Sequence, residues 1–225
     1  MFKLERDTYI PTHFNREDVR PMSVPIEGTM YSAGILVSEA GTFFVKTLRP
    51  DVTSRFRGAS TLSDFFQEQQ RTHDTVAQYL AGDEVSYMLP SGFVTLDRGD
   101  EVTYHIVQPL VVGAVQFKQF RLSSQTLPPT YIPPFEERVD FATRIGNLQN
   151  ATRKLIDLDF FIVGLPEPGI VVFDATYMWY DKREGKDKAD QGYHLTQFLF
   201  PNGEQRDENQ EKIVRDVLKH LTATF

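Results

Sequence analysis

The residues best suited to chemistry are a lysine and an aspartate placed within or at the end of apolar segments. Lys46 interrupts Gly41-Thr-Phe-Phe-Val-Lys-Thr-Leu48, a run of residues that favour β-strands. An ammonium group in a half-buried strand requires an anionic partner. Asp174 follows the apolar run Ile170-Val-Val-Phe173, and a carboxylate at the end of a buried strand typically binds a cation or a metal ion. The sequence therefore predicts an anionic partner for Lys46 and a partner or a metal ion for Asp174.

Three further features surround the lysine in an order that suits phosphate binding. Upstream, Gly28 and Gly34 punctuate a β-forming stretch. Glycines let backbone N–H groups approach a phosphate closely because they carry no Cβ. Downstream, an amphipathic segment over 62–80 predicts a helix that carries Glu68, and a later apolar strand ends near Gln108. A glycine-bearing hairpin, a strand lysine and a helix glutamate therefore follow one another along the chain.

In this order the residues resemble the small lobe of the protein-kinase-like superfamily. The resemblance implies that Gly28 to Gly34 is a loose glycine-rich hairpin, that Lys46 holds the α- and β-phosphates of ATP, and that Glu68 orients the lysine. The segment Ile106–Gly113, which contains Gln108, resembles the last small-lobe strand and the hinge whose backbone binds adenine. Asp174 resembles the aspartate that holds Mg²⁺ against the nucleotide phosphates.

The positions expected for catalysis match the family pattern only in part. Asp157 and Asp159 precede Asp174 at about the expected distance and are the candidates for the base that accepts a hydroxyl proton. The family has an asparagine five residues after this aspartate, where the chain has Ile162 or Gly164. The glycine expected after Asp174 is also missing. The resemblance therefore implies binding of ATP and Mg²⁺, with phosphotransfer as a further hypothesis on incomplete motifs.

A second hypothesis uses the same aspartate in a metal-dependent nuclease. Asp174 is followed by Glu184 and Lys186, the bare spacing Asp then Glu-x-Lys. In such enzymes two carboxylates hold Mg²⁺ and the lysine helps to activate water. Here the glutamate and lysine lie in the charged stretch 181–188, which favours a solvated loop over the rigid strand that this chemistry needs.

A third hypothesis is a catalytically inactive kinase-like protein that serves as a platform for a protein partner. A group of aromatic residues beside the charged stretch could anchor that partner, and the same alternation also suits a half-buried strand. The aromatic residues are Tyr177, Trp179 and Tyr180.

Composition narrows the class of protein. The 225 residues carry a net charge of −7, so binding of nucleic acid is not expected without a local basic patch. The absence of cysteine excludes disulfides and thiolate metal sites and fits a reducing compartment. No membrane-spanning run or signal peptide is apparent, and we expect a cytoplasmic protein that does not bind membranes. The sequence contains no phosphate-binding P-loop motif and no serine- or cysteine-nucleophile motif.

Periodicity predicts an α+β protein with a kinase-like organisation. An irregular leader over 1–23 precedes an antiparallel small lobe over 24–110 that contains one helix, and residues 111–225 form a reduced, mainly helical lobe. Strands are expected over 26–31, 34–38, 42–48, 85–89, 93–97 and 101–108. Helices are expected over 62–80, 135–156 and 208–221, with Gly82 ending the first and Thr61 or Ser60 beginning it.

Overall fold

The chain is an α+β protein with two compact units, seen here in a computed structural model. The first unit contains Met1–Gln70 and Leu89–Val112, and the second contains Arg71–Met88 and Gly113–Phe225. The sequence division had placed all of 24–110 in one lobe, whereas residues 71–88 group with the second unit. The structure describes residues 9–22, 31–49, 61–83, 85–99, 101–111, 113–118, 121–122, 132–152, 155–163, 169–178, 195–201 and 206–222.

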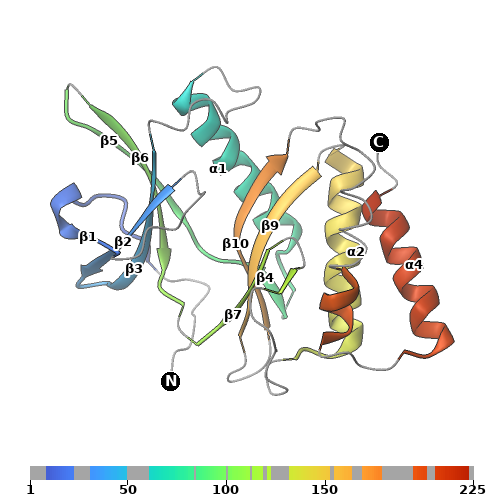
Figure 1. Cartoon of the computed structure of the whole chain (residues 1–225). Helices are drawn as coiled ribbons and strands as arrows, with labels where there is room; N and C mark the ends of the chain where they lie inside the picture. The colour runs from blue at the N-terminus through green and yellow to red at the C-terminus, as the bar shows by residue number, and fades with distance from the viewer. Residues whose placement is uncertain are drawn as a thin grey trace. The chain divides into compact units, whose positions relative to one another are not determined.

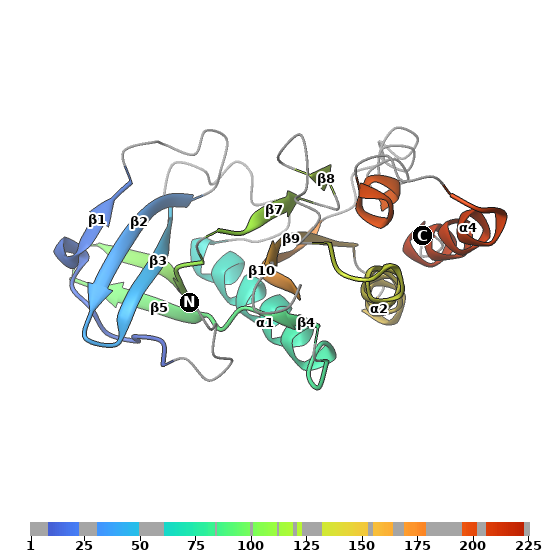
Figure 2. The ribbon, with the colours of Figure 1, turned by 90° about the horizontal axis from the view of Figure 1, so that it is seen from below.

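The first unit is built on a five-stranded sheet in the order β1-β2-β3-β6-β5, and all its pairs are antiparallel. Figure 2 shows the neighbouring strands β1, β2 and β3 of this sheet. The antiparallel sheet predicted for this part of the chain is present. Its strands are β1 (Val19–Pro21), β2 (Tyr31–Ser38), β3 (Gly41–Leu48), β5 (Gly92–Asp97) and β6 (Val102–Pro109).

Alternating side chains give this sheet two apolar faces. Phe43 and Val45 of β3 belong to one buried cluster, which also contains Leu36, Val94 and Val107. Leu48 of β3 belongs to the cluster on the other face, with Tyr31, Phe66 and Ile106. Because successive residues of a strand point to opposite faces, the run that surrounds Lys46 supplies both clusters.

Helix α1 (Leu62–Tyr79) begins in the first unit and ends in the second. The side chain of Thr61 accepts a hydrogen bond from the backbone N–H of Asp64 at 3.1 Å, so Thr61 is the N-cap. Gly82, with a φ of 83°, follows the helix as expected for a left-handed C-terminal turn. Phe66 from the N-terminal half packs with the strands of the first unit, and Val76 from the C-terminal half packs in the second.

The second unit contains a mixed sheet in the order β4-β10-β9-β7-β8. The prediction that 85–89 continues an antiparallel meander is wrong, because β4 (Ser86–Met88) pairs in parallel with β10. The remaining strands are β7 (Val115–Lys118), β8 (Arg121–Leu122), β9 (Leu155–Val163) and β10 (Gly169–Met178).

Residues 111–225 contain helices, as predicted, together with four strands of the second sheet. The predicted extent of the helix over 135–156 is wrong. Helix α2 (Phe135–Thr152) ends before 156, and the chain then forms β9, which runs beside β10 over their whole length (Figure 1). Leu158, Phe160 and Ile162 of β9 lie on one side of the strand, and all three are buried. Helix α4 (Glu208–Thr222) lies beside α2 in Figures 1 and 2.

The core of the second unit lies between its sheet and these helices. Phe141 of α2 contacts Phe160 of β9 edge-on, with ring centroids 5.3 Å apart. Phe198, in a helical segment at 195–199, packs against both rings. Within the described ranges no helix is both long and apolar enough to cross a membrane.

Candidate functional site

Lys46 lies at the centre of the first sheet and is only 6% exposed. Its Cα is paired with Ala33 on β2 and with Ile106 on β6. Because Ile106 is directly opposite and Leu48 is two residues away, the lysine shares the sheet face on which Phe66 of α1 packs. The sequence prediction of a lysine within a buried strand is therefore confirmed.

Gln108 lies on the same face of the sheet as Lys46, on the neighbouring strand. It is paired with Phe44, two residues before the lysine, and is 2% exposed. Its side-chain amide donates a hydrogen bond to Ser91 Oγ at 2.8 Å. β6 ends at Pro109, so Gln108 stands where the chain leaves the sheet for the segment that the sequence suggested as a hinge.

Further polar groups are buried on this face. The hydroxyl of Tyr31 donates a hydrogen bond to Oε1 of Gln69, which is 2% exposed. Glu68, the residue expected to orient Lys46, precedes Gln69 on α1 and is half-buried. The structure therefore places Lys46 and Glu68 in the same unit, and a direct interaction between them stays a prediction. The Tyr31–Gln69 pair carried no sequence signal, since a glutamine in a glutamine-rich helix gives no sign of burial.

Of the two glycines assigned to a phosphate-binding hairpin, the structure describes only one. Gly28 lies outside the described residues. Gly34 lies in the middle of β2, between Pro21 on β1 and Val45 on β3, and not in a turn. A Cβ at Gly34 would lie 2.5 Å from Val19 Cγ1. The structure thus explains this glycine by the close approach of β1.

Asp174 lies on β10 directly opposite Asp159 on β9. Ile170 and Val172 face the core, so plain alternation would point residue 174 into it as well. A register shift between Val172 and Asp174 inserts one extra residue. Ala175 consequently enters the core and Asp174 joins the face opposite to it, which is how a bulge redirects a side chain.

Asp159 projects away from the core, as its position between Leu158 and Phe160 predicts, and it is half-buried with its Oδ1 atom inaccessible. Its other strand neighbour is Lys118 on β7, of which only the backbone position is described. Asp174, Asp159 and Lys118 therefore occupy adjacent positions across three strands. The sequence did not single out Lys118, since it ends a short strand far from both aspartates in the chain.

Two neighbouring carboxylates are a suitable starting point for Mg²⁺, which takes one or two carboxylates and keeps several waters. In the described part of the chain no group of three or more histidine, aspartate or glutamate side chains is arranged to share a metal ion. Asp157, the other candidate base, has its backbone opposite Thr176 on β10, and its side chain lies outside the described set.

Several predicted site residues cannot be placed. Glu184 and Lys186 of the nuclease hypothesis lie outside the described residues, as do Trp179 and Tyr180. The backbone of Tyr177 belongs to β10, opposite Ile156. The sequence matches no protein-family model and no curated protein. The site is therefore interpreted from its own geometry.

Proposed function

We propose that this protein binds a nucleotide together with Mg²⁺, with Lys46 as the phosphate ligand. The observation that carries the proposal is the burial of Lys46 on β3, on the same face of the sheet as Gln108 of the neighbouring strand β6. A lysine ammonium group with three donors is a common ligand for phosphate groups, and this one is fixed in place by the packed sheet around it.

The spacing of the two strands supports a nucleotide over a simple phosphate. Gln108 pairs with Phe44, two residues from Lys46. At the rise of an antiparallel strand, two residues span about 7 Å. A ligand that contacts both the backbone beyond Gln108 and the lysine must therefore span this distance. Its hydrogen-bonding group and its phosphates must be joined by a linking group. A nucleoside phosphate has this form, and the kinase-like order of hairpin, lysine strand, helix and final strand supports the same reading.

We assign Mg²⁺ to Asp174 with Asp159 as its neighbour. Both are on the non-core face of the second sheet and are paired directly. Two carboxylates side by side repel each other, and a divalent cation removes that repulsion. Asp157 and Asp159 are two residues apart on β9 and therefore share one face with Asp174, so both stay candidates for the base of a phosphotransfer reaction.

The proposal is tested by thermal unfolding with and without ATP–Mg²⁺, in the wild type and in Lys46→Met. A ligand at a hundred times its Kd stabilises the folded state by about 2.7 kcal/mol. We expect this stabilisation in the wild type and its loss in the variant. Lys212→Met, which removes an exposed lysine on α4, is the matched control and should keep the full response.

Absence of any response of the wild type to millimolar ATP–Mg²⁺ would exclude the nucleotide site. A response that Lys46→Met retains would show that the nucleotide binds elsewhere. Far-UV circular dichroism establishes that Lys46→Met is folded, and Gln108→Ala provides a second variant if it is not. The alternatives are separated by other assays: a nuclease would cut nucleic acid without ATP and depend on Glu184 and Lys186, whereas an interaction platform would be indifferent to Lys46→Met and Asp174→Asn.

A further inference from the structure

The segment 9–18, here called the strap, covers the apolar face of the first sheet that α1 leaves uncovered. Ile10 and Phe14 pack against the buried cluster that contains Phe43, Val45 and Val107. The backbone–backbone hydrogen bonds that the described residues show for the strap are local, from Asp18 N–H to Asn15 and from Val19 N–H to Arg16. Side chains therefore attach the strap to the sheet.

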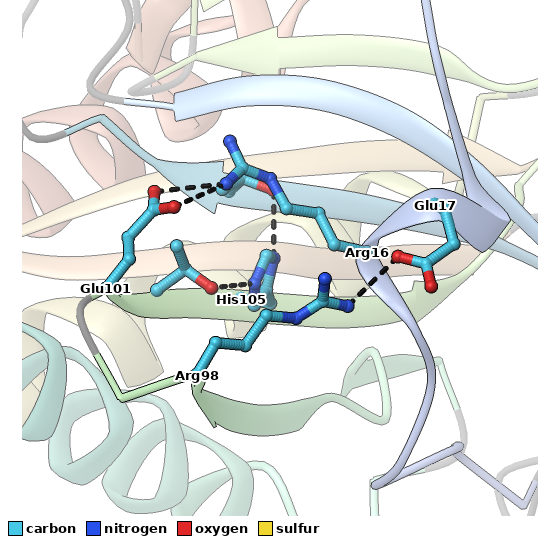
Figure 3. A network of polar contacts seen from close by, with 7 residues as sticks. Arg16, Glu17, Arg98, Glu101 and His105 are labelled. Atoms are coloured by element: carbon cyan, nitrogen blue, oxygen red, sulfur yellow. Dashed lines mark hydrogen bonds and ion pairs between the residues drawn. The ribbon is translucent and has the colours of Figure 1, made fainter.

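Two ion pairs hold the strap, one on each side of His105 (Figure 3). Arg16 contacts both carboxylate oxygens of Glu101 at 3.0 Å. Arg98 contacts Glu17 at 3.0 Å. All four side chains are half or more exposed, so each pair is weak and is screened by salt.

One side of the strap borders solvent. A pocket of about 370 Å³, open to the surface, lies between the strap and the strands β1 and β2. Pro11, Phe14, Leu36 and Val37 line its apolar part, and His13, Glu17, Asp18, Arg20 and Ser38 line the rest. Surface segments with a solvent-exposed side open locally at lower free energy than the core.

His105 lies under the strap and is 1% exposed. Thr47 and Thr103 contact its two ring nitrogens at 2.9 and 2.8 Å, and the ring of Phe14 meets it edge-on at 5.4 Å. Burial and the nearby Arg16 lower the pKa of His105 from 6.5 to about 4. Departure of the strap removes both Phe14 and Arg16, so protonation of His105 favours the open state.

We propose that residues 9–18 form an electrostatically latched strap that leaves the apolar face of the first sheet in acid or high salt while the sheet remains folded. Protonation of His105 and loss of the carboxylate charge both favour the open strap. Between pH 6.5 and 4 an open strap lets His105 bind a proton that the closed form excludes. At lower pH Glu17, whose pKa is lowered by hydrogen bonds to the backbone and to Arg98, loses the charge that binds Arg98. A pKa that falls from 6.5 to about 4 on closure shifts the open-to-closed ratio by at most ~300-fold.

The chain offers a direct way to lock the strap. A Cβ at position 92 would lie 3.7 Å from the Cβ of Ile10. This separation is close to the ~3.8 Å found in disulfides. The chain has no cysteine, so the double variant Ile10→Cys/Gly92→Cys forms a single defined cross-link.

The readout is fluorescence of an apolar dye, with far-UV circular dichroism as the measure of folded structure. We expect the wild type to bind little dye at pH 7 in low salt, and several-fold more at pH 4.5 or in 1 M NaCl at pH 7. The oxidised double variant should bind little dye in every condition, and its reduced form should respond like the wild type. Glu101→Gln should bind dye at pH 7 in low salt, whereas Glu211→Gln on α4 should not.

Equal dye binding by the oxidised and reduced double variant would overturn the proposal, as would a wild type that responds to neither acid nor salt. A loss of secondary structure that accompanies dye binding in both conditions would also overturn it, because the strap would then have no opening separate from unfolding. If the double variant does not fold, His105→Asn serves instead: it should lose the response to pH 4.5 and keep the response to salt.

Discussion

Asp159 on β9 and Asp174 on β10 are directly opposite residues of one antiparallel strand pair. Like charges at such positions repel each other and destabilise a sheet. A divalent cation held by both carboxylates would offset such repulsion. This relationship allows the metal assignment to be tested without any assay of activity.

Asp174→Asn should raise stability in EDTA and abolish stabilisation by Mg²⁺. Removal of one charge from the pair relieves about 0.5–1 kcal/mol of repulsion. Thermal unfolding with EDTA and with 10 mM MgCl₂ measures both effects. Asp216→Asn on the exposed side of α4 removes the same charge and should leave the Mg²⁺ response intact. A wild type that is insensitive to Mg²⁺ would contradict the assignment.

Gly34→Ala should destabilise the protein because the neighbouring strand β1 leaves no room for a side chain at this position of β2. The added methyl group would lie 2.5 Å from Val19 Cγ1 and 3.0 Å from the carbonyl oxygen of Arg20. Overpacking of this kind costs about 1–3 kcal/mol. In urea unfolding, Val19→Ala in the same chain should recover part of the loss but not all, since the backbone contact remains. If the losses of unfolding free energy caused by Gly34→Ala and Val19→Ala simply add in the double variant, the packing explanation is wrong.

Arg138→Met should be among the most damaging substitutions in the second unit. The guanidinium of Arg138 is buried, and its Nη1 donates to the backbone oxygen of Leu199 at 2.6 Å. Loss of a charged hydrogen bond that leaves a buried carbonyl unsatisfied costs about 2–3 kcal/mol. Urea unfolding should show this loss. Lys219→Gln breaks the exposed pair with Asp216 and should cost less than about 1 kcal/mol. Similar effects of the two variants would contradict the interpretation.

His105→Asn should flatten the dependence of stability on pH. The folded-state pKa of His105 lies at about 4, below the ordinary 6.5, so the unfolded chain binds a proton that the folded chain excludes. Its contribution is complete above pH 6.5 and is lost as the pH falls toward 4. Unfolding free energies at pH 7 and 4.5 should differ by up to about 2 kcal/mol less in the variant, and by less than this where opening of the strap lets the folded chain bind the same proton. Parallel pH profiles would show that other groups govern acid sensitivity.

Local pattern was sufficient to predict most elements of this protein. The strands around Phe43 and Val94 and the helices that begin at Leu62, Phe135 and Glu208 lie where periodicity and capping residues place them. The α+β class and the burial of Lys46 followed from the same signals, because an apolar run of β-forming residues buries whatever it contains.

Partner choice between strands was decided by the tertiary structure. β4 follows α1 and precedes β5 in the chain, yet it joins the second sheet in parallel with β10. Residues 155–163 continue the apolar pattern of α2, and their pairing with β10 makes them a strand. No local signal distinguishes these outcomes, since the favourable energy comes from residues distant in sequence.

The sequence alone determined that Lys46 is a buried cation and that Asp174 ends an apolar strand. The neighbours of Lys46 and of Asp174 depend on the tertiary structure. The register shift after Val172 turns Asp174 away from the core and toward Asp159, and the ladder between β3 and β6 brings Gln108 to the side of Lys46. The physical reason is that a one-residue change of register moves a side chain to the opposite face, and register depends on the whole sheet.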